Sequence, residues 1–198
     1  MIRNLIFDFG YVLVGYRWKE MLTDDFGIEE AHAGEIGHRM FDDPKWGDYD
    51  RGIVSTEELI DYYSSLYPED SATISRMIHE AERMLVPRER LWKKIEELKK
   101  RGFRLYILSN YSGYLFNKHA EHIPIMDKLD GRVVSYEFHK MKPEPEIYEI
   151  LLDKYGLIPE ECLFFDDTKE NVDAAKNIGI AAIQVFSEDM LIEELNKL

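Results

Sequence analysis

The amino-acid sequence predicts an α/β protein, with a parallel sheet between two layers of helices and a helical segment inserted after the first strand. Short apolar runs of strand length recur along the C-terminal half, and segments with apolar residues at helical spacing separate them. Strands that alternate with helices need crossover connections, and these place the strands in parallel. The stretch 16–85 lacks convincing strands, which predicts a separate helical insertion.

The composition is that of a globular protein and excludes several functional classes. Hydrophobic residues make up 45% of the 198 residues and charged residues 32%, which suits one domain with a small insertion. The formal net charge of −14 argues against a nucleic-acid partner, because phosphate backbones need a concentrated basic surface. Cys162 is the one cysteine, so an intrachain disulfide or a zinc site of several thiolates is excluded.

The sequence also predicts a cytoplasmic protein without a membrane partner. No run approaches the roughly 18 consecutive apolar residues that a membrane helix needs. The first residues enter a strand-like run at once and lack the layout of a signal peptide. We expect a monomer or a weak homodimer.

The first two elements follow from local patterns. The apolar run 5–7 is too short for a helix and is followed by Asp8 and Gly10, which predicts a buried strand that leads into a loop. In the stretch 16–85, apolar residues such as Leu59 and Tyr63 fall at helical spacing, which predicts a helical insertion.

The C-terminal half alternates between helices and strands. A helix is expected to begin near Pro87, because proline favours a first helical turn, and to end at Gly102. The remaining predicted elements are a strand over 103–108, a short strand over 132–138, a helix over 144–155 ended by Gly156, a strand over 163–165, a helix through Val172, Ala175 and Ile178 ended by Gly179, and a strand over 180–186.

Polar side chains follow three of the predicted strands. Asp8, Ser109 and the pair Asp166-Asp167 stand at strand ends, where open α/β sheets bind ligands. Each alone could close a turn or cap a helix. Together the carboxylates repel one another, and magnesium, which prefers a few carboxylates with several waters, relieves that repulsion. Lys142 precedes a predicted helix and could reach a phosphate as a point charge. The sequence therefore predicts a magnesium-dependent phosphate site.

These residues occur in an order that resembles the four motifs of the haloacid dehalogenase (HAD) superfamily. The motifs are Asp8 to Leu13, Ser109-Asn110, Lys142-Pro143, and Asp166-Asp167 with Asn171. The resemblance implies a Rossmann-like three-layer core of residues 1–15 and 86–198, with a small α-helical cap of residues 16–85. Gly10 and the cap segment 49–55 are similar to those of the alpha-D-glucose-1-phosphate phosphatase subgroup.

The resemblance implies a magnesium-dependent phosphatase, a phosphoric monoester hydrolase that acts on small phosphorylated metabolites. Sugar phosphates such as glucose 1-phosphate are the expected substrates. Asp8 is implied as the nucleophile that forms an aspartyl phosphate, a strategy known for carboxylates. Ser109 and Lys142 are implied to bind the transferring phosphoryl group.

The resemblance also assigns metal and substrate ligands. Magnesium would be held by Asp8, the backbone carbonyl of Gly10 and Asp167, with Asp166 nearby or bound through water, and with Asn171 in a supporting position. The expected substrate-binding residues are Asn110, Arg51 and Tyr11. Arg51 could equally form a salt bridge to Asp48 or Asp50, and Tyr11 could instead shape the entrance.

Gly10 departs from the family pattern. Most phosphatases of the superfamily carry an aspartate there, which protonates the leaving group, and such assistance is worth about 10²–10⁴-fold. Either the substrate has a leaving group that needs little protonation, as an anomeric phosphate does, or the cap supplies the acid from Asp48, Tyr49 or Asp50. A non-catalytic binding protein of the same fold, or a metal-independent haloacid dehalogenase, are the alternative functions.

Overall fold

The computed structural model describes residues 1–198 and is built on one five-stranded parallel sheet. The strands lie in the order β5-β4-β1-β6-β7, and every neighbouring pair is parallel. Their bounds are β1 Asn4–Phe7, β4 Arg104–Ser109, β5 Gly131–Val134, β6 Cys162–Asp166 and β7 Ala181–Gln184. The predicted α/β fold with a parallel sheet is confirmed, and the first strand of the chain is its centre.

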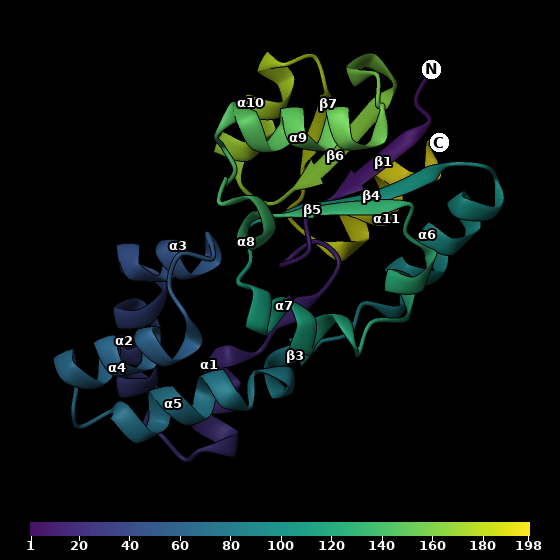
Figure 1. Ribbon diagram of the computed structural model, residues 1–198. Helices are drawn as coiled ribbons and strands as arrows, with labels where there is room; N and C mark the ends of the chain where they lie inside the picture. Colours follow the sequence, from purple (N-terminus) through teal and green to yellow (C-terminus); the bar gives the residue numbers. More distant parts are fainter.

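Helices cover both faces of this sheet (Figure 1). Their bounds are α6 Glu89–Lys100, α9 Pro145–Tyr155, α10 Lys169–Asn177 and α11 Glu188–Asn196. Side chains alternate along a strand, so Phe7 and Phe165 pack in one cluster with α6 and α11, while Ile6 and Phe164 pack with α9 and α10. The result is the three-layer Rossmann-like arrangement. No helix in the molecule is both long and apolar enough to cross a lipid bilayer.

Three predicted element boundaries are wrong. The last strand ends at Gln184 rather than at residue 186, and tertiary contacts explain the other two. Helix α6 begins at Glu89 rather than near Pro87, because Arg88 has a non-helical backbone and its guanidinium donates to the Val12 carbonyl oxygen over 2.9 Å. The strand expected over 132–138 ends at Val134, and a short helix, α8 (Ser135–Phe138), follows. Local residue preference could not reveal these contacts with distant parts of the chain.

The insertion after the first strand is helical and has its own core. Its elements are α1 Trp18–Glu20, the π-helix Met21–Asp25, α2 Glu30–Phe41, α3 Pro44–Asp50, α4 Thr56–Leu66, α5 Ser71–His79 and the 3₁₀ turn Ala81–Met84. Local chemistry fixes the start of α4, where the Ser55 hydroxyl and the Glu58 carboxylate cap each other's backbone N–H groups. Leu59 and Tyr63 are fully buried among its apolar side chains.

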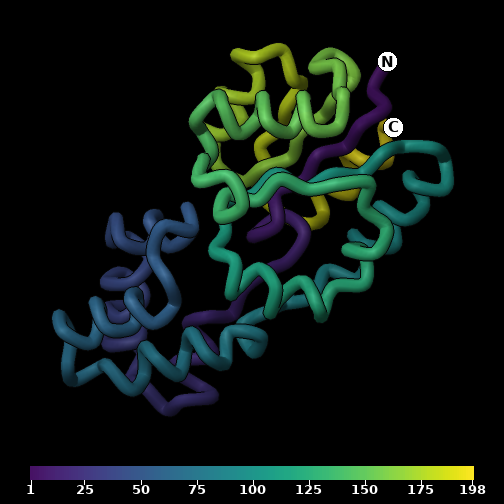
Figure 2. Tube along the Cα trace, in the orientation of Figure 1, coloured from purple at the N-terminus to yellow at the C-terminus, as the bar shows by residue number.

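Two short antiparallel strands, β2 (Gly15–Tyr16) and β3 (Leu85–Val86), lie where the chain leaves the core and returns to it. Figure 2 shows the two connections side by side between the helical cap and the sheet. We propose to divide the chain at these strands, into a core of residues 1–15 and 86–198 and a cap of residues 16–85. The remaining core elements are α7 Gly113–Ala120 and the 3₁₀ turns Pro124–Lys128 and Pro159–Glu161.

Candidate active site

Three carboxylates meet at the carboxyl edge of the sheet. Asp8 follows the central strand β1, and Asp166 and Asp167 stand at the end of the adjacent strand β6. The backbone N–H of Asp8 donates to the Phe165 carbonyl oxygen over 2.9 Å, which continues the pairing of the two strands into the site. One carboxylate oxygen from each acid lies within 4.8 Å of the other two.

Lys142 connects two of these acids. Its Nζ lies 2.9 Å from Asp8 Oδ1 and 2.6 Å from Asp166 Oδ2, and its side chain is only 1% exposed. Burial alone would lower the pKa of Lys142, but the negative charges of Asp166 and Asp8 outweigh it and raise the pKa above the ordinary value. The ammonium group is therefore fixed, charged and shielded from water.

The site carries more negative than positive charge. Burial raises the pKa of Asp8 to about 7 against the opposing effect of Lys142, with Asp166 and Asp167 adding to the rise. The pKa of Asp167 is raised as well, by burial and by the charge of Asp166. Three carboxylates against one ammonium leave a charge excess that a divalent cation would balance, and oxygen donors are the ligands that magnesium prefers. The donor set fits magnesium.

The two acids at the end of β6 differ in their surroundings. Asp166 is fully buried, and its Oδ1 accepts hydrogen bonds from the Thr168 N–H at 2.8 Å and from Asn171 Nδ2 at 3.0 Å. Together with Lys142, these donors hold the Asp166 carboxylate in place. The side chain of Asp167 is less enclosed than that of Asp166 and accepts a hydrogen bond from its own backbone N–H, and no other residue donates one to it, which leaves lone pairs of that carboxylate available to an ion.

Ser109 and Asn110 follow the neighbouring strand β4, and they differ from each other in placement. Ser109 is buried beside Asp8, and its hydroxyl opposes the rise in the pKa of Asp8. Asn110 uses both ends of its amide on the backbone of Lys142: Nδ2 donates to the carbonyl oxygen over 2.8 Å, and Oδ1 accepts from the N–H at 2.7 Å. The Asn110 amide therefore positions the Lys142 loop, Asn110 also lines the cavity between cap and core, and its expected role in substrate binding stays a prediction.

Arg51 also differs from the expectation. Its guanidinium donates to Glu144 Oε1 over 2.6 Å and to the His139 carbonyl oxygen over 3.2 Å. These contacts join the cap to the core segment before α9, and Arg51 is not among the residues that line the cavity described below. The alternative salt bridge to Asp48 or Asp50 is wrong, because Glu144 is the acid that the fold brings to Arg51. The role of Arg51 as a substrate ligand stays a prediction.

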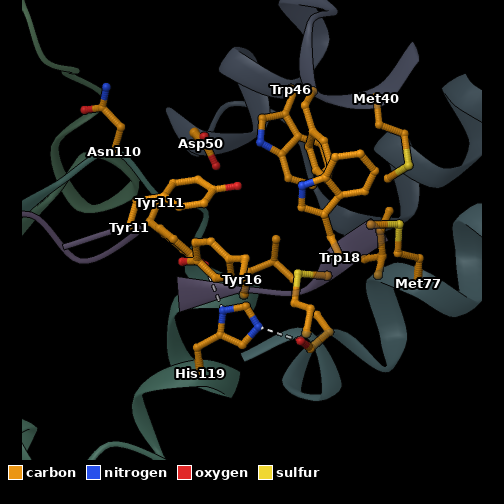
Figure 3. A pocket seen from close by; sticks show the side chains of 15 residues that line it. Tyr11, Tyr16, Trp18, Met40, Trp46, Asp50, Met77, Asn110, Tyr111 and His119 are labelled. Atoms are coloured by element: carbon orange, nitrogen blue, oxygen red, sulfur yellow. Dashed lines mark hydrogen bonds between the residues drawn. The ribbon is translucent and has the colours of Figure 1, made fainter. Parts of the chain in front are cut away.

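A cavity of about 280 Å³ lies between cap and core (Figure 3). Tyr11 lines it, is 48% exposed and has a φ of 54°, a left-handed conformation that is rare for residues other than glycine. The Tyr11 ring packs edge-to-face on Tyr16, with 5.0 Å between ring centroids. The structure places Tyr11 at the wall of this cavity, and its expected role in substrate binding stays a prediction.

Of the three cap residues considered as acids, one faces the cavity. Asp50 lines it, and Asp50 Oδ1 accepts a hydrogen bond from the Ser112 N–H at 3.0 Å. Burial raises the pKa of Asp50 to about 7, and the charge of Asp8 adds to the rise. The Tyr49 hydroxyl instead bonds to Thr56 inside the cap, 3.0 Å away, and Asp48 does not line the cavity.

Sequence reasoning missed a hydrogen-bonded chain of three cavity residues. The hydroxyls of Tyr16 and Tyr111 are 2.5 Å apart, and the Tyr111 hydroxyl is 2.7 Å from His119 Nδ1. His119 Nε2 is 2.9 Å from the Ala81 carbonyl oxygen. These residues lie far apart in the sequence, and no motif or spacing connects them. Only the fold brings them together.

Comparison with known proteins gives the family and the fold. The family model of the haloacid dehalogenase-like hydrolases matches residues 23–179. The sesquiterpene phosphatase astK of Aspergillus oryzae is 24% identical over 193 residues, which cover 98% of this chain and 94% of that protein. A D-ribitol-5-phosphate phosphatase of Bacteroides thetaiotaomicron is 29% identical over 91 residues, which cover 43% of this chain and 44% of that protein.

A solved structure has the same fold. It is a variant of a HAD family enzyme of Bacteroides thetaiotaomicron, in complex with magnesium and inorganic phosphate, with a TM-score of 0.71 and 19% identity. The match covers 94% of this chain and 95% of that one. The strand-end carboxylates, the buried lysine, the parallel sheet and the family match agree: this chain belongs to the haloacid dehalogenase-like hydrolases.

Proposed function

We propose that this protein is a magnesium-dependent phosphatase that hydrolyses phosphate monoesters of small organic molecules. The observation that carries the proposal is the cluster of Asp8, Asp166 and Asp167 around the buried ammonium of Lys142. In this cluster a carboxylate lies beside a fixed ammonium and next to a position for a divalent cation. Such an arrangement is suited to binding and attacking a phosphoryl group. Relatives named as phosphatases support the same activity.

Magnesium would be held by Asp8, Asp167 and the backbone carbonyl of Gly10, with Asp166 nearby or bound through water. When bound, the ion supplies positive charge that neutralises the carboxylates and the oxygens of the phosphoryl group. Support for the ion comes from the excess of carboxylates in the cluster and from the magnesium in a structure of the same fold.

In the proposed mechanism Asp8 is the nucleophile. An Asp8 oxygen attacks phosphorus, the bond from phosphorus to the ester oxygen breaks, and the alcohol leaves. Water then attacks the aspartyl phosphate, which releases inorganic phosphate and restores the Asp8 carboxylate. Lys142 stays charged throughout and offsets the repulsion between Asp8 and the phosphate dianion, and the buried Ser109 hydroxyl beside Asp8 is positioned to contact the phosphoryl oxygens.

We assign the missing acid to Asp50. Gly10 has no side chain that could protonate the leaving alcohol, whereas Asp50 reaches the cavity from the cap and keeps its proton up to about pH 7. Asp50 would give its proton to the ester oxygen in the first step and take one from the attacking water in the second, so that protons balance over the cycle.

The names of the relatives include both an apolar alcohol, a sesquiterpene, and a polyhydroxylated one, ribitol. The expected preference for glucose 1-phosphate, the similarity to the alpha-D-glucose-1-phosphate phosphatase subgroup, the cytoplasmic location, and the monomer or weak homodimer all stay predictions.

Hydrolysis of p-nitrophenyl phosphate tests the proposed activity, because its leaving group needs no acid. We expect turnover that EDTA removes and magnesium restores, and a loss of at least about 10³-fold in kcat for Asp8→Asn, because an amide is not a nucleophile for phosphorus. Asp153→Asn, the same change at an exposed site on α9, should leave the activity unchanged.

Other results would support the alternatives. A protein that binds phosphate with magnesium but turns over no ester would be a non-catalytic binding protein. Release of chloride from 2-chloropropionate without magnesium, and no phosphate release, would indicate a haloacid dehalogenase. Magnesium-dependent turnover that survives Asp8→Asn would contradict the assigned nucleophile.

A further inference from the structure

The cavity between cap and core is apolar over most of its wall. Twelve of its fifteen lining residues are hydrophobic, and they come from both the cap and the core. Figure 3 shows Asn110 and Asp50 on one side of the cavity and Trp18, Met40 and Met77 on the other. Because Asn110 holds the backbone of Lys142, the polar side is the one next to the phosphoryl site. The apolar side is therefore where the body of a bound ester would extend.

Three polar side chains in the apolar part, those of His119, Tyr111 and Tyr16, are already paired with one another. His119 is fully buried, and burial lowers its pKa to about 4, so its ring is neutral at pH 7. Its Nε2–H donates to the Ala81 carbonyl oxygen, which leaves Nδ1 to accept from Tyr111. The Tyr111 oxygen then accepts the proton of the Tyr16 hydroxyl. Every donor in this chain is used, and no cationic side chain lines the cavity.

A polyhydroxylated ligand would bind poorly in such a space. On binding in this cavity, sugar hydroxyls would lose their hydrogen bonds to water. Few unpaired donors or acceptors of the cavity would replace those bonds, so binding would be unfavourable. An apolar ligand gives up no hydrogen bonds to water on entering the cavity, and the burial of its apolar surface favours binding. Unbranched side chains such as Met40, Met77 and Met84 can also adapt to an irregular apolar ligand.

We propose that this cavity binds the alcohol part of the substrate and that the preferred substrates are phosphate monoesters of uncharged, apolar alcohols with aliphatic or aromatic bodies. The inference rests on the proposed phosphatase function and makes its substrate class specific. It is an alternative to the sugar phosphates expected from the sequence, because the mostly apolar lining of the cavity favours a hydrocarbon over a polyhydroxylated alcohol.

A series of n-alkyl monophosphates tests the proposal. From ethyl to octyl phosphate, kcat/KM should rise about fourfold for each added methylene until the cavity is full, since burying one methylene is worth about 0.8 kcal/mol and 1.4 kcal/mol corresponds to tenfold. Octyl phosphate should exceed glucose 1-phosphate by at least about tenfold. A flat series, or a preference for glucose 1-phosphate, would overturn the proposal while leaving the phosphatase function intact.

A cavity variant and its control separate recognition from stability. Met77→Gln places an amide in the cavity and should lower the ratio of octyl to ethyl phosphate turnover by about tenfold, whereas Met77→Leu should keep that ratio. Met21→Gln is the matched control, because Met21 is equally buried in the cap but does not line the cavity. Equal loss of the ratio in both glutamine variants would contradict the assignment of this cavity.

Binding to the Asp8→Asn variant tests the proposal without turnover. Calorimetry with alkyl phosphonates and magnesium should show octylphosphonate binding at least about tenfold more tightly than ethylphosphonate. If the protein hydrolyses no ester, the phosphatase proposal fails, and this measurement still decides the chemistry of the cavity. Equal affinities for the two phosphonates would show that the apolar wall is not used.

Discussion

The residue that separates this chain from most phosphatases of its family is Gly10, and its surroundings explain why a larger residue is absent. A Cβ at position 10 would lie 3.1 Å from both Cε2 and the hydroxyl oxygen of Tyr16, closer than an ordinary contact. An aspartate at position 10 would therefore require the Tyr16 side chain to shift. The proton donor must come from elsewhere, and Asp50 is the carboxyl that lines the same cavity.

Substitution of Asp50 tests its role as the acid. Asp50→Asn should lower kcat/KM for alkyl phosphates by about 10²–10⁴-fold, because their leaving alcohols need protonation in the first step, and should change kcat/KM for p-nitrophenyl phosphate by less than about threefold. In the natural protein, activity on alkyl phosphates should fall as the pH rises above about 7, where Asp50 loses the proton it must donate. That alkaline decrease should be absent in Asp50→Asn.

The neighbouring acid provides the control for that experiment. Asp48→Asn removes a carboxylate of the cap that does not line the cavity, so its rates and pH profile should match those of the natural protein. If Asp50→Asn lowered kcat/KM for both kinds of ester equally, Asp50 would be a structural residue through its bond to the Ser112 N–H, and not the proton donor.

At the scale of elements, helix α7 connects the cap to the core through a buried histidine. His119 lies on this helix, and its folded-state pKa of about 4 is below the ordinary value of 6.5. Between these two values the unfolded chain binds a proton that the folded chain does not, so the free energy of unfolding rises with pH there. It should fall by about 3 kcal/mol as the pH is lowered from 6.5 to 4, on the basis of 1.36 kcal/mol per pKa unit.

Urea denaturation at a series of pH values measures this effect. His119→Gln should be less stable at pH 7, because the bonds to Tyr111 and Ala81 are disturbed, and should lose much less additional stability on acidification. His122→Gln, a change at an exposed histidine just beyond the same helix, should retain the full pH dependence. An unchanged slope in His119→Gln would assign the acid sensitivity to other groups.

Elements whose residues carry a local signal could be predicted, and these include the strand ends that form the site. Apolar runs followed by Asp8, Ser109 and Asp166 predicted the strands, and the parallel topology brings their ends to one edge. Contacts between distant segments could not be predicted. The start of α6 depends on the bond from Arg88 to Val12, and the turn into α8 coincides with Ser135 bonding to Tyr111 and Asp50.

The same distinction applies to side chains of the candidate site. The sequence predicted Asn110 near the substrate from its position in a motif, and Arg51 because a guanidinium can bind hydroxyls or an anionic group. The structure assigns the Asn110 amide to the backbone of Lys142 and the Arg51 guanidinium to Glu144. Motif position locates a residue on the fold, but the direction of its side chain depends on partners that only the three-dimensional arrangement supplies.

At the scale of the whole molecule, the cap docks on the core through the segment Asp50 to Gly52. The Ser135 hydroxyl donates to the Asp50 carbonyl oxygen, and His139 Nδ1 lies 2.9 Å from the Arg51 carbonyl oxygen. The Arg51 side chain pairs with Glu144. These contacts involve the same segment that carries the proposed acid, so docking of the cap and positioning of Asp50 are one event. Closure of this kind also excludes water from the cavity.

A glycine at the end of this segment allows a clean test of docking. Gly52 has a φ of 75°, and a Cβ there would lie 2.8 Å from the Tyr136 carbonyl oxygen. Gly27 has nearly the same φ, 73°, but a Cβ there would meet nothing within 4 Å. An alanine at either position carries the same backbone strain, about 1–2 kcal/mol, and only Gly52→Ala also pushes the cap away from the core.

Gly52→Ala should therefore lower kcat/KM for octyl phosphate by at least about tenfold, and hydrogen exchange should increase in the segments of both partners, 50–52 and 135–139. Gly27→Ala should be destabilised by a similar amount through backbone strain, as measured by thermal unfolding, and should keep its kcat/KM within about twofold of that of the natural protein. If both variants lost activity equally, or if Gly52→Ala kept full activity, catalysis would not depend on the docked position of the cap, and Asp50 would have to act from a cap that is free to move.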